Sequence, residues 1–363
     1  MKIAQVCHRY YPYIGGVETR VEEISKRLVK RSFDVDVLTT DPSGKLTSER
    51  IVNGVRVKRF RCWAPNDTYY FSGRLRRYLT RHSASYDLVH AHNYPDLPAF
   101  YAAQTKSTNR LVFTPHYHGG GRTLFTNLLY IPYKILGGKI FKKADRIICV
   151  SNYEKTLVME NFRVEEEKIS VIPNGLNIEE FKGIVSKRKD YKTILYVGRL
   201  EKYKGLHYLI EALTKLDNDV FLEIVGVGSQ KNALFKLANK LEVGDRIKFY
   251  QNLPRNQLLQ KYADADVFVL LSKREAYGIG VAEALSSGTP CIVTNSSALT
   301  EWVDGKDCFG VDYPPNIDEV IRLLREVIGK KVNGANIHAR APSWNEVVDK
   351  LVKVYEYSKS EVN

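Results

Sequence analysis

One stretch in the second half of the chain decides the fold: Arg274-Glu275-Ala276-Tyr277-Gly278-Ile279-Gly280-Val281-Ala282-Glu283-Ala284-Leu285. It lies between two short apolar runs rich in β-branched residues, Val267–Leu270 and Cys291–Thr294. A glycine-containing loop followed by a helix over 279–287 is a typical connection between two buried parallel strands. The stretch therefore predicts a strand–helix–strand unit of an α/β fold.

The same alternation extends in both directions along the chain. In the first half, Ile3–Cys7 and Val35–Thr39 are expected strands, with a helix between them over Gly16–Lys30. Further strands are expected there at Leu88–His92, Leu111–Thr114, Arg146–Ser151 and Ile169–Pro173. The second half predicts strands Thr193–Val197, Phe221–Val225 and Ile247–Tyr250, with helices over 205–215 and 230–241. Both halves thus read as parallel sheets covered by helices.

Length and composition are those of a two-domain globular protein. The chain has 363 residues, of which 44% are apolar and 26% charged, so it exceeds one typical domain and can bury a core. We expect an N-terminal α/β domain over 1–175, a polar linker over 176–190 and a second α/β domain over 191–342. The last stretch, 343–363, is expected to form a helix with a broad apolar face.

The chain is strongly basic, and the charge is unevenly distributed. The formal net charge is +14, and residues 1–180 hold 28 basic and 18 acidic side chains, so the first half carries +10. Such a field attracts anionic partners. The five cysteines form no Cys-x-x-Cys pair, which argues against a disulfide framework and a zinc ribbon. With no apolar run long enough to span a membrane, the sequence indicates a cytoplasmic protein.

Two carboxylates of the decisive stretch, Glu275 and Glu283, lie eight residues apart across the start of the expected helix. If the helix begins near Gly278, its free amides, that of Ile279 among them, suit a phosphate. Glu283 then lies in the second turn, about 7 Å further along the axis. A carboxylate there can accept hydrogen bonds from the vicinal hydroxyls of a ribose.

Cations gather where the first strand of the second half ends. Val197-Gly198 is followed by Arg199, and Lys204-Gly205 opens the next helix. Ligands of open α/β sheets bind at the carboxyl ends of the strands, so Arg199 and Lys204 can hold a diphosphate. For this segment alone, a solvated charged loop is the alternative.

Short motifs of the same kind recur along the chain. Gly15 and Gly16 follow the first strand and let backbone approach a phosphate closely, although Glu18 beside them also suits the first turn of an ordinary helix. The other motifs are Thr114-Pro115-His116, Val171-Ile172-Pro173-Asn174-Gly175 and Ile224-Val225-Gly226-x-Gly228. Together with the Glu275 and Glu283 pair and the segment of Arg199 and Lys204, these motifs occur in one fixed order that resembles glycosyltransferase family 4. The resemblance extends to Trp344 and Tyr355 near the C-terminus.

The resemblance implies a GT-B fold, in which two Rossmann-like domains face each other across a cleft and the C-terminal helix crosses back to the N-terminal domain. It further implies a retaining transfer of a hexosyl group from a nucleotide-diphosphate sugar, UDP- or GDP-linked, to a hydroxyl acceptor. The positive charge of the first half, rather than the resemblance, makes a lipid-linked or phosphorylated acceptor, such as a lipid-linked glycan or a glycolipid, the expected one. The nucleotide sugar acts as co-substrate, and no other cofactor is implied.

The resemblance also assigns roles by position. Arg199 and Lys204 match the pair that binds the donor diphosphate and stabilises the leaving group. Glu275 matches the carboxylate that contacts sugar hydroxyls, Glu283 the one that binds ribose, and His116 a histidine near the sugar and the attacking hydroxyl. His116, Arg199, Lys204 and Glu275 are thus the expected catalytic residues. Further donor-binding positions are Gly15, Gly16, Gly226, Gly278 and Ile279, and candidates for sugar or acceptor contact are His118 and Glu301.

The sequence departs from the family pattern in two places. Ser297-Ala298-Leu299-Thr300-Glu301 stands where relatives often have Gly-Gly-x-x-Glu, which keeps Glu301 but adds side chains to a loop near the sugar. Cys308 stands where a glycine is frequent. The first departure leaves the identity of the sugar open.

Metal sites are not expected, although two patterns imitate them. His90-Ala-His92 and His116-Tyr-His118 are His-x-His pairs, but strand alternation alone puts such residues on one face. Asp-x-Asp pairs begin at Asp34, Asp217 and Asp264, each at an expected turn or strand boundary, where aspartate commonly caps the backbone.

Three other functions compete with glycosyl transfer. Glu275 and Glu283 could be the paired carboxylates of a glycoside hydrolase, but that chemistry gives Arg199 and Lys204 no role. A sugar-nucleotide epimerase of the same fold would also bind a diphosphate donor, and would form product without an acceptor. A basic chain with 23 tyrosines could bind nucleic acid, but no known nucleic-acid module is recognisable, so we expect none bound.

The first half also holds a segment that mixes large apolar and basic side chains, 122–143. Such a segment suits either an anionic membrane interface or a core-packed helix whose lysine stems reach solvent. Four arginines, Arg74, Arg76, Arg77 and Arg81, add to the positive charge of this half. They favour a peripheral position on the inner face of the cell membrane.

Overall fold

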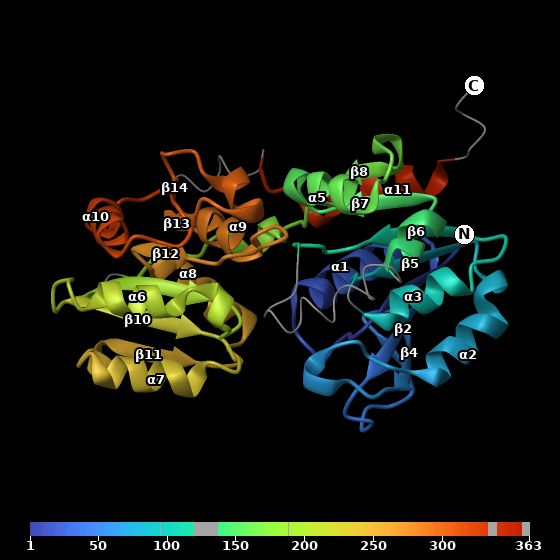
Figure 1. Ribbon diagram of the computed structural model, residues 1–363, viewed down its shortest axis with the longest axis horizontal. Helices are drawn as coiled ribbons and strands as arrows, with labels where there is room; N and C mark the ends of the chain where they lie inside the picture. The colour runs from blue at the N-terminus through green and yellow to red at the C-terminus, as the bar shows by residue number, and fades with distance from the viewer. Residues whose placement is uncertain (95, 120–136, 188, 333–339, 358–363) are drawn as a thin grey trace. The chain divides into compact units, whose positions relative to one another are not determined.

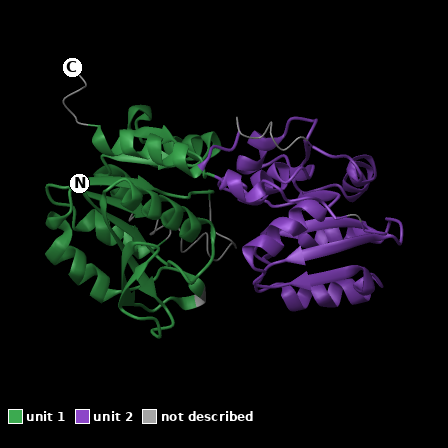
Figure 2. Ribbon diagram, turned by 180° about the vertical axis from the view of Figure 1, so that it is seen from behind, with its two compact units in different colours: residues 1–175, 344–363 green, residues 176–343 purple. Residues whose placement is uncertain are grey.

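The chain divides into two compact units (Figure 2), Met1–Gly175 with Trp344–Asn363 and Leu176–Ser343. The computed structural model describes residues 1–94, 96–119, 137–187, 189–332 and 340–357. The stretch 176–190, expected as a linker, is counted with the second unit. Gln260 Nε2 donates to the Val185 carbonyl at 3.0 Å, and the Lys187 amide donates to Asp264 Oδ1 at 2.8 Å, which ties this stretch to its unit.

The first unit is built on an eight-stranded sheet (Figure 1) of order β3-β4-β2-β1-β5-β6-β7-β8. Its strands are β1 (Lys2–Cys7), β2 (Asp34–Asp41), β3 (Glu49–Val52), β4 (Val55–Arg61), β5 (Leu88–His92), β6 (Arg110–Thr114), β7 (Arg146–Cys149) and β8 (Ile169–Val171). All neighbours are parallel except β3 and β4, which form a hairpin. Sequential strands lie on either side of β1, so the sheet has a switch point between β1 and β5.

Helices cover both faces of this sheet. One face packs against α2 (Gly73–His82), α3 (Leu97–Gln104), α5 (Asn152–Phe162) and the helical residues 137–143. The other face packs against α1 (Gly16–Lys30) and α11 (Trp344–Glu356). In α11, Val347, Leu351 and Tyr355 recur at helical spacing and are fully buried, which explains why the last helix joins the first unit.

The second unit is a six-stranded sheet of order β11-β10-β9-β12-β13-β14, parallel throughout. Its strands are β9 (Lys192–Val197), β10 (Val220–Val225), β11 (Ile247–Tyr250), β12 (Val267–Leu270), β13 (Cys291–Thr294) and β14 (Cys308–Val311). Its helices are α6 (Leu206–Leu213), α7 (Lys231–Lys240), α8 (Arg255–Asp264), α9 (Ile279–Ser286) and α10 (Ile317–Val327). The switch point lies between β9 and β12, where open α/β sheets bind ligands.

The expected strands and helices up to residue 342 are confirmed, each with ends within two residues, and within the expected last stretch, 343–363, the helix runs over Trp344–Glu356. Of the basic and apolar segment 122–143, residues 122–136 lie outside the described residues. Among the helices that the structure describes, none is long and apolar enough to cross a membrane.

Candidate active site

The loops that follow β9 and β12 bring together the charged residues expected in the second unit. Arg199 comes two residues after the end of β9, and Glu275 lies in the loop between β12 and α9. β9 and β12 are neighbours in the sheet and define its switch point. The two loops therefore leave the same edge of the sheet side by side, as a ligand site of this architecture requires.

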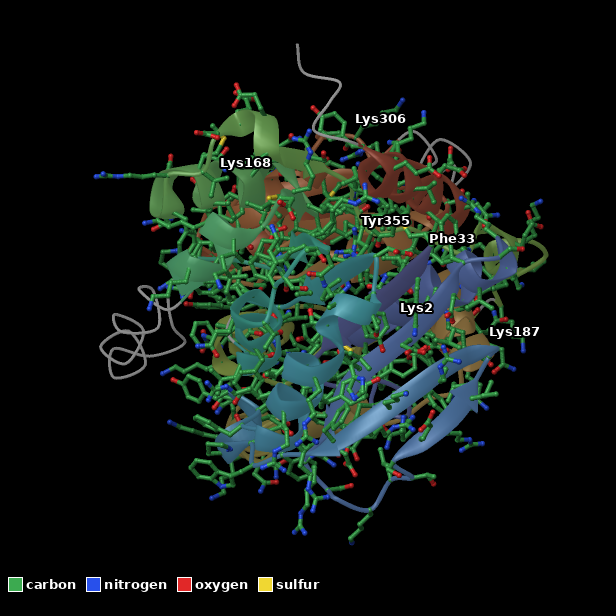
Figure 3. The ribbon with its side chains drawn as sticks, turned by 90° about the vertical axis from the view of Figure 1, so that its right-hand side faces the viewer. Lys2, Phe33, Lys168, Lys187, Lys306 and Tyr355 are labelled. Atoms are coloured by element: carbon green, nitrogen blue, oxygen red, sulfur yellow. The ribbon has the colours of Figure 1, made fainter. Side chains whose placement is uncertain are left out.

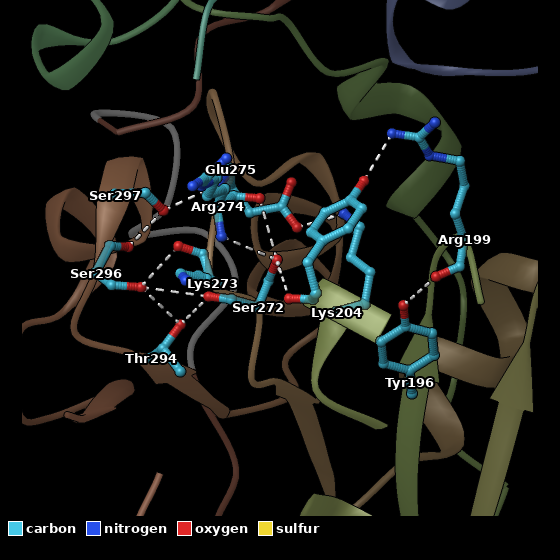
Figure 4. A network of polar contacts seen from close by, with 11 residues as sticks. Tyr196, Arg199, Lys204, Ser272, Lys273, Arg274, Glu275, Thr294, Ser296 and Ser297 are labelled. Carbon is cyan, nitrogen blue, oxygen red and sulfur yellow. Dashed lines mark hydrogen bonds and ion pairs between the residues drawn. The ribbon is translucent and has the colours of Figure 1, made fainter. Parts of the chain in front are cut away.

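Lys204 and Glu275 form an ion pair at this edge (Figure 4), with Nζ and Oε1 2.5 Å apart. Their side chains are 11% and 16% exposed, so the pair is largely shielded from water. Lys204 ends a short 3-10 helix, Lys202–Lys204, and Gly205 after it has a φ of 74°. A Cβ at Gly205 would lie 2.0 Å from the Leu271 carbonyl oxygen, so only glycine lets the two loops approach this closely.

Arg199 lies at the surface of the same edge. Its Nη2 donates to the Tyr203 hydroxyl at 2.7 Å, and its carbonyl accepts from the Tyr196 hydroxyl at 2.8 Å (Figure 4). The guanidinium side chain itself is exposed. A planar fork in this position can bind a phosphate in bidentate geometry.

Glycines allow the neighbouring loop after β10 to pack under Arg199. A Cβ at Gly226 would lie 1.9 Å from the Gly198 carbonyl oxygen, and one at Gly228 2.4 Å from the Leu200 carbonyl oxygen. The motif Gly226-x-Gly228 is therefore required for the close approach of two backbones. These two glycines are thus needed for backbone packing, independently of any contact with a ligand.

Helix α9 begins as the sequence predicts. Gly278 is its N-cap, with a φ of 97°, and Ile279 is its first residue. The Val281 amide donates to the Gly278 carbonyl at 3.0 Å, whereas the amides of Ile279 and Gly280, the first two residues of α9, come before the first intrahelical bond. The Glu275 amide donates to Ser297 Oγ at 3.0 Å, and the Ala298 amide donates to the Glu275 carbonyl at 3.3 Å, which fixes this loop against the one after β13.

Glu283, in the second turn of α9, has a partner that the sequence did not reveal. Arg255 Nη1 donates to Glu283 Oε1 at 2.6 Å, and Arg255 Nε donates to Glu180 Oε2 at 2.8 Å. Glu283 is 8% exposed. The carboxylate expected to bind ribose is thus held in place by an arginine that connects it to Glu180. Arg255 is the first residue of α8, far from the motifs in sequence, and no local pattern marks it.

The switch point of the first unit carries a cluster of buried charges. His8 follows β1, and its ring lies between Glu18 (Nε2 to Oε1, 3.4 Å) and Asp96 (Nδ1 to Oδ2, 3.2 Å). Burial lowers the pKa of His8, but the two carboxylates outweigh it and raise the pKa above its ordinary value. Burial likewise tends to raise the pKa of Glu18, yet His8 and Arg9 lower it to about 2. Arg9 Nε donates to Glu18 Oε1 at 3.0 Å.

This cluster accounts for the first of the paired glycines. A Cβ at Gly15 would lie 2.4 Å from Glu18 Oε2, so a side chain there would push the carboxylate away from its bonds to His8 and Arg9. Gly15 is the N-cap of α1 and Gly16 its first residue. Glu18 is thus more than an acid in a first helical turn, because it joins the N-terminal glycine loop to the end of β1.

His116 follows β6 at the carboxyl edge of the same sheet. Its φ is 50°, and its Nε2 is buried with no hydrogen-bond partner among the described residues. Burial and the charge of Arg20 lower the pKa of His116 to about 3, so its imidazole is neutral near pH 7. The next amide, that of Tyr117, donates to Glu154 Oε1 at 2.5 Å, which anchors this loop to α5.

The two further candidates lie in different units. His118 is half-buried beside the same loop, with Nδ1 3.4 Å from the Gly119 carbonyl oxygen. Glu301 is exposed in the 3-10 helix Ser297–Trp302, which follows β13. Each of them thus lies near the carboxyl edge of its own sheet.

The residues that imitate metal ligands have other partners. His90 and His92 bind Tyr355, Thr114 and Gln5 rather than converging on one point with His118. Asp34 pairs with Arg56 at 2.8 Å, Asp264 Oδ1 accepts from the Lys187 amide, and Asp266 Oδ2 accepts from the Thr193 amide. Within the described part of the chain, no group of three or more histidine, cysteine, aspartate or glutamate residues is placed to hold a metal ion.

Families of known proteins match both halves of the chain. Residues 14–180 match the family described as Glycosyltransferase Family 4, and residues 177–344 match Glycosyl transferases group 1. The glycogen synthase of Mycobacterium tuberculosis is 30% identical, with 99% of this chain and 95% of that protein covered.

Solved structures show the same fold. Sucrose-phosphate synthase from Thermosynechococcus elongatus superimposes with a TM-score of 0.82 at 19% identity, covering 98% of each chain. The Anabaena protein HepE, solved in complex with UDP-glucose, gives a TM-score of 0.78 at 18% identity, covering 98% of this chain and 99% of that one. The two parallel α/β units, the family matches over both of them and the relative at 30% identity together show that the chain belongs to glycosyltransferase family 4 and has the GT-B fold.

Proposed function

We propose that this glycosyltransferase moves a hexosyl group, with retention of configuration, from a nucleotide-diphosphate sugar to a hydroxyl acceptor. The observation that carries the proposal is the edge of the second unit, where Arg199, Lys204 and the start of α9 gather positive charge and free amides at the switch point. A diphosphate is the ligand that such an edge favours. UDP or GDP is the proposed nucleotide, and the HepE complex with UDP-glucose supports UDP.

In this proposal the second unit holds the donor. Arg199 and Lys204 bind the diphosphate, and Lys204 exchanges its bond to Glu275 for phosphate oxygens when the donor enters. Glu275, released from the lysine, accepts hydrogen bonds from sugar hydroxyls. Glu283 keeps its bond to Arg255 through Oε1 and offers Oε2 to the ribose hydroxyls. The backbone at Gly226, Gly278 and Ile279 completes the donor site.

The chemical step exchanges one bond at the anomeric carbon for another. The bond from that carbon to the β-phosphate oxygen breaks, and the acceptor oxygen bonds to the carbon on the same face. The acceptor proton passes to the leaving phosphate, so charge and atoms balance. Cations and amides at the diphosphate stabilise the charge that develops there, an effect worth several kcal/mol in comparable sites.

Residues of the first unit act on the sugar and the acceptor in this scheme. Because the His116 imidazole is neutral, it accepts or donates a hydrogen bond to a sugar or acceptor hydroxyl rather than supplying positive charge. Gly15 and Gly16 bring backbone close to the donor phosphates. His118, and Glu301 of the second unit, are proposed to contact the acceptor or the sugar.

We further propose that the transfer requires no metal ion, because two side-chain cations and a helix start can neutralise the leaving group. Turnover in excess chelator should equal turnover in buffer. Loss of turnover in chelator, restored by added magnesium or manganese, would contradict this part of the proposal.

The acceptor is proposed to be a lipid-linked glycan or a glycolipid on the inner face of the cell membrane. Trp63 and Phe71 are 67% and 42% exposed, and their rings contact each other in a tilted arrangement with centroids 5.3 Å apart, in the segment before α2. Arg74, Arg77 and Arg81 lie exposed on α2 itself. Exposed aromatic rings next to arginines are typical of protein surfaces that rest in an anionic lipid interface.

A basic groove continues this surface. Arg76, Lys139 and Lys143 line a groove of about 630 Å³ together with Phe100 and residues at the end of α3. The stretches 73–82, 97–104 and 137–143 contain no aspartate or glutamate at all. Each basic residue that such helices bring near an acidic bilayer contributes about 1 kcal/mol to binding.

Vesicle co-sedimentation tests the membrane part. Reversing Arg74, Arg77 and Arg81 to glutamate should weaken binding to vesicles containing phosphatidylglycerol by about 100-fold or more. The matched control reverses three lysines of α7 in the second unit, Lys231, Lys236 and Lys240. Equal loss in both triple variants, or none in the first, would contradict the proposed surface.

Product analysis tests the transferase itself. The stabilising nucleotide is first identified by the rise in unfolding temperature that UDP, GDP or ADP produces. The corresponding nucleotide sugars are then offered with glycolipid acceptors, and the anomeric configuration of the product is read by NMR. An inverted product would contradict retention, and a converted nucleotide sugar without acceptor would indicate an epimerase instead.

A further inference from the structure

A network of buried, hydrogen-bonded side chains connects the C-terminal helix with the carboxyl edge of the sheet in the first unit. The Tyr355 hydroxyl lies 2.6 Å from His90 Nδ1 and 3.3 Å from Gln5 Nε2. His90 Nε2 lies 2.8 Å from Thr114 Oγ1, and His92 Nε2 lies 2.8 Å from Gln5 Oε1. All five side chains are at most 1% exposed (Tyr355 is labelled in Figure 3), so no water competes for these bonds.

The direction of these bonds follows from the donors available. Gln5 Nε2 can only donate, so the Tyr355 oxygen accepts from it and the hydroxyl proton goes to His90 Nδ1. His90 then carries its proton on Nε2 and donates to Thr114, while His92 donates through Nε2 to Gln5 Oε1. The one atom left without a described partner, His92 Nδ1, is then an acceptor. The reverse direction would leave a buried N–H donor there, which costs more.

This network reaches His116, the residue expected to contact the sugar, through the ring of His92. The rings of His90 and His92 lie 4.0 Å apart, and the ring of His92 stacks on that of His116 at 6.1 Å and 27°. Burial, and after it the charge of Arg20, lower the pKa of His90 well below its ordinary value, and burial does the same for His92. The stack therefore consists of neutral rings, and hydrogen bonds set the proton positions of two of them, His90 and His92.

We propose that Tyr355 is a positioning residue, which fixes the ring orientations of His90 and His92 and, through the stack, that of His116. The C-terminal helix thus contributes to the catalytic edge of the first unit as well as to its core. The proposal rests on the proposed role of His116 in transfer. Its structural half, the orientation of the rings, stands independently of that role.

Replacing Tyr355 with phenylalanine removes one buried hydroxyl and keeps the ring. We expect kcat to fall about tenfold with the KM for the nucleotide sugar within twofold, because a misplaced polar group loses rate rather than donor affinity. In the free protein, the imidazole ¹⁵N resonances of His90, His92 and His116 should all shift. The control is Tyr86→Phe, since the Tyr86 hydroxyl is also buried and donates to Asp36 Oδ2 at 2.6 Å.

Tyr86→Phe should lower the unfolding temperature comparably, yet leave kcat and the ¹⁵N resonances of the three histidines unchanged. Unchanged resonances in Tyr355→Phe would overturn the positioning role. Shifted resonances with unchanged kcat would leave the rings positioned by Tyr355 but overturn their link to catalysis. If His116→Ala also retains full kcat, the fault lies in the proposed role of His116.

Discussion

Lys204→Met tests how the donor site works, because it removes the charge and keeps a side chain of similar length. The ammonium lies 2.5 Å from Glu275 Oε1, in a pair whose members are 11% and 16% exposed. A hydrogen bond to a charged group contributes about 1.5 to 3 kcal/mol. If Lys204 transfers that bond to the diphosphate, Lys204→Met should weaken UDP binding by about 10- to 150-fold.

The partner of the ion pair behaves differently in this account. Glu275→Gln removes the competitor for the ammonium, so UDP should bind as tightly as in the wild type or more tightly. The same variant loses its contact with sugar hydroxyls, so UDP-sugar should gain nothing over UDP. In stability, Lys204→Met leaves a mostly buried carboxylate without its cation and should cost about 1 to 3 kcal/mol. Adding Glu275→Gln to that variant should recover part of the loss.

Titration calorimetry with UDP and with UDP-sugar measures both affinities, and urea unfolding measures stability. Lys202→Met is the matched control, because Lys202 belongs to the same 3-10 helix and is exposed. It should bind UDP within twofold of the wild type. The reasoning is refuted if Lys204→Met and Lys202→Met bind UDP equally well, or if Lys204→Met loses stability but keeps full turnover.

Three further outcomes follow from the described contacts. Arg255→Met should weaken UDP binding about tenfold by releasing Glu283, whereas Arg246→Met, which removes bonds only to backbone carbonyls, should not. Gly226→Ala places a methyl 1.9 Å from a carbonyl oxygen and should lower the unfolding temperature by several degrees. The pKa of Glu18 is lowered from 4.5 to about 2, so its ionised carboxylate stabilises the fold by about 3 kcal/mol above pH 4.5. This stabilisation is lost as the pH falls through 2. The free energies of unfolding of Glu18→Gln and the wild type, measured in urea, should therefore converge at low pH.

Much of the fold could be predicted from the sequence, because buried parallel strands are short continuous apolar runs. Val267–Leu270 and Cys291–Thr294 are strands with these same ends. The hairpin of β3 and β4 was missed although Asn53-Gly54, with φ values of 52° and 82°, is a strong two-residue turn signal. Its strands carry arginine and lysine, and half-exposed strands at and next to the edge of a sheet lack the apolar run on which the prediction depended.

The candidate site could be predicted only as far as local motifs reach. Arg199, Lys204 and Glu275 follow strand ends, and the topology of a parallel sheet brings such positions to one edge. Arg255 was missed because it acts through Glu283, 28 residues away, and spacing along the chain carries no sign of that contact.

The buried network was beyond sequence reasoning for the same reason. His90 and His92 were considered as metal ligands, but their partners are Gln5 and Tyr355, which lie near opposite ends of the chain. A pattern of two residues on one strand face fixes neither what lies opposite nor which hydrogen bonds form. Only the packing of α11 on the first sheet decides this.

Diffraction from crystals grown with UDP, or with whichever nucleoside diphosphate stabilises the protein more, is the most direct test of the donor site. The account predicts the diphosphate within hydrogen-bond distance of the Lys204 ammonium and the Arg199 guanidinium, with the Lys204–Glu275 bond broken. A diphosphate bound elsewhere on the chain, or a lysine still paired with Glu275 beside the bound nucleotide, would contradict it.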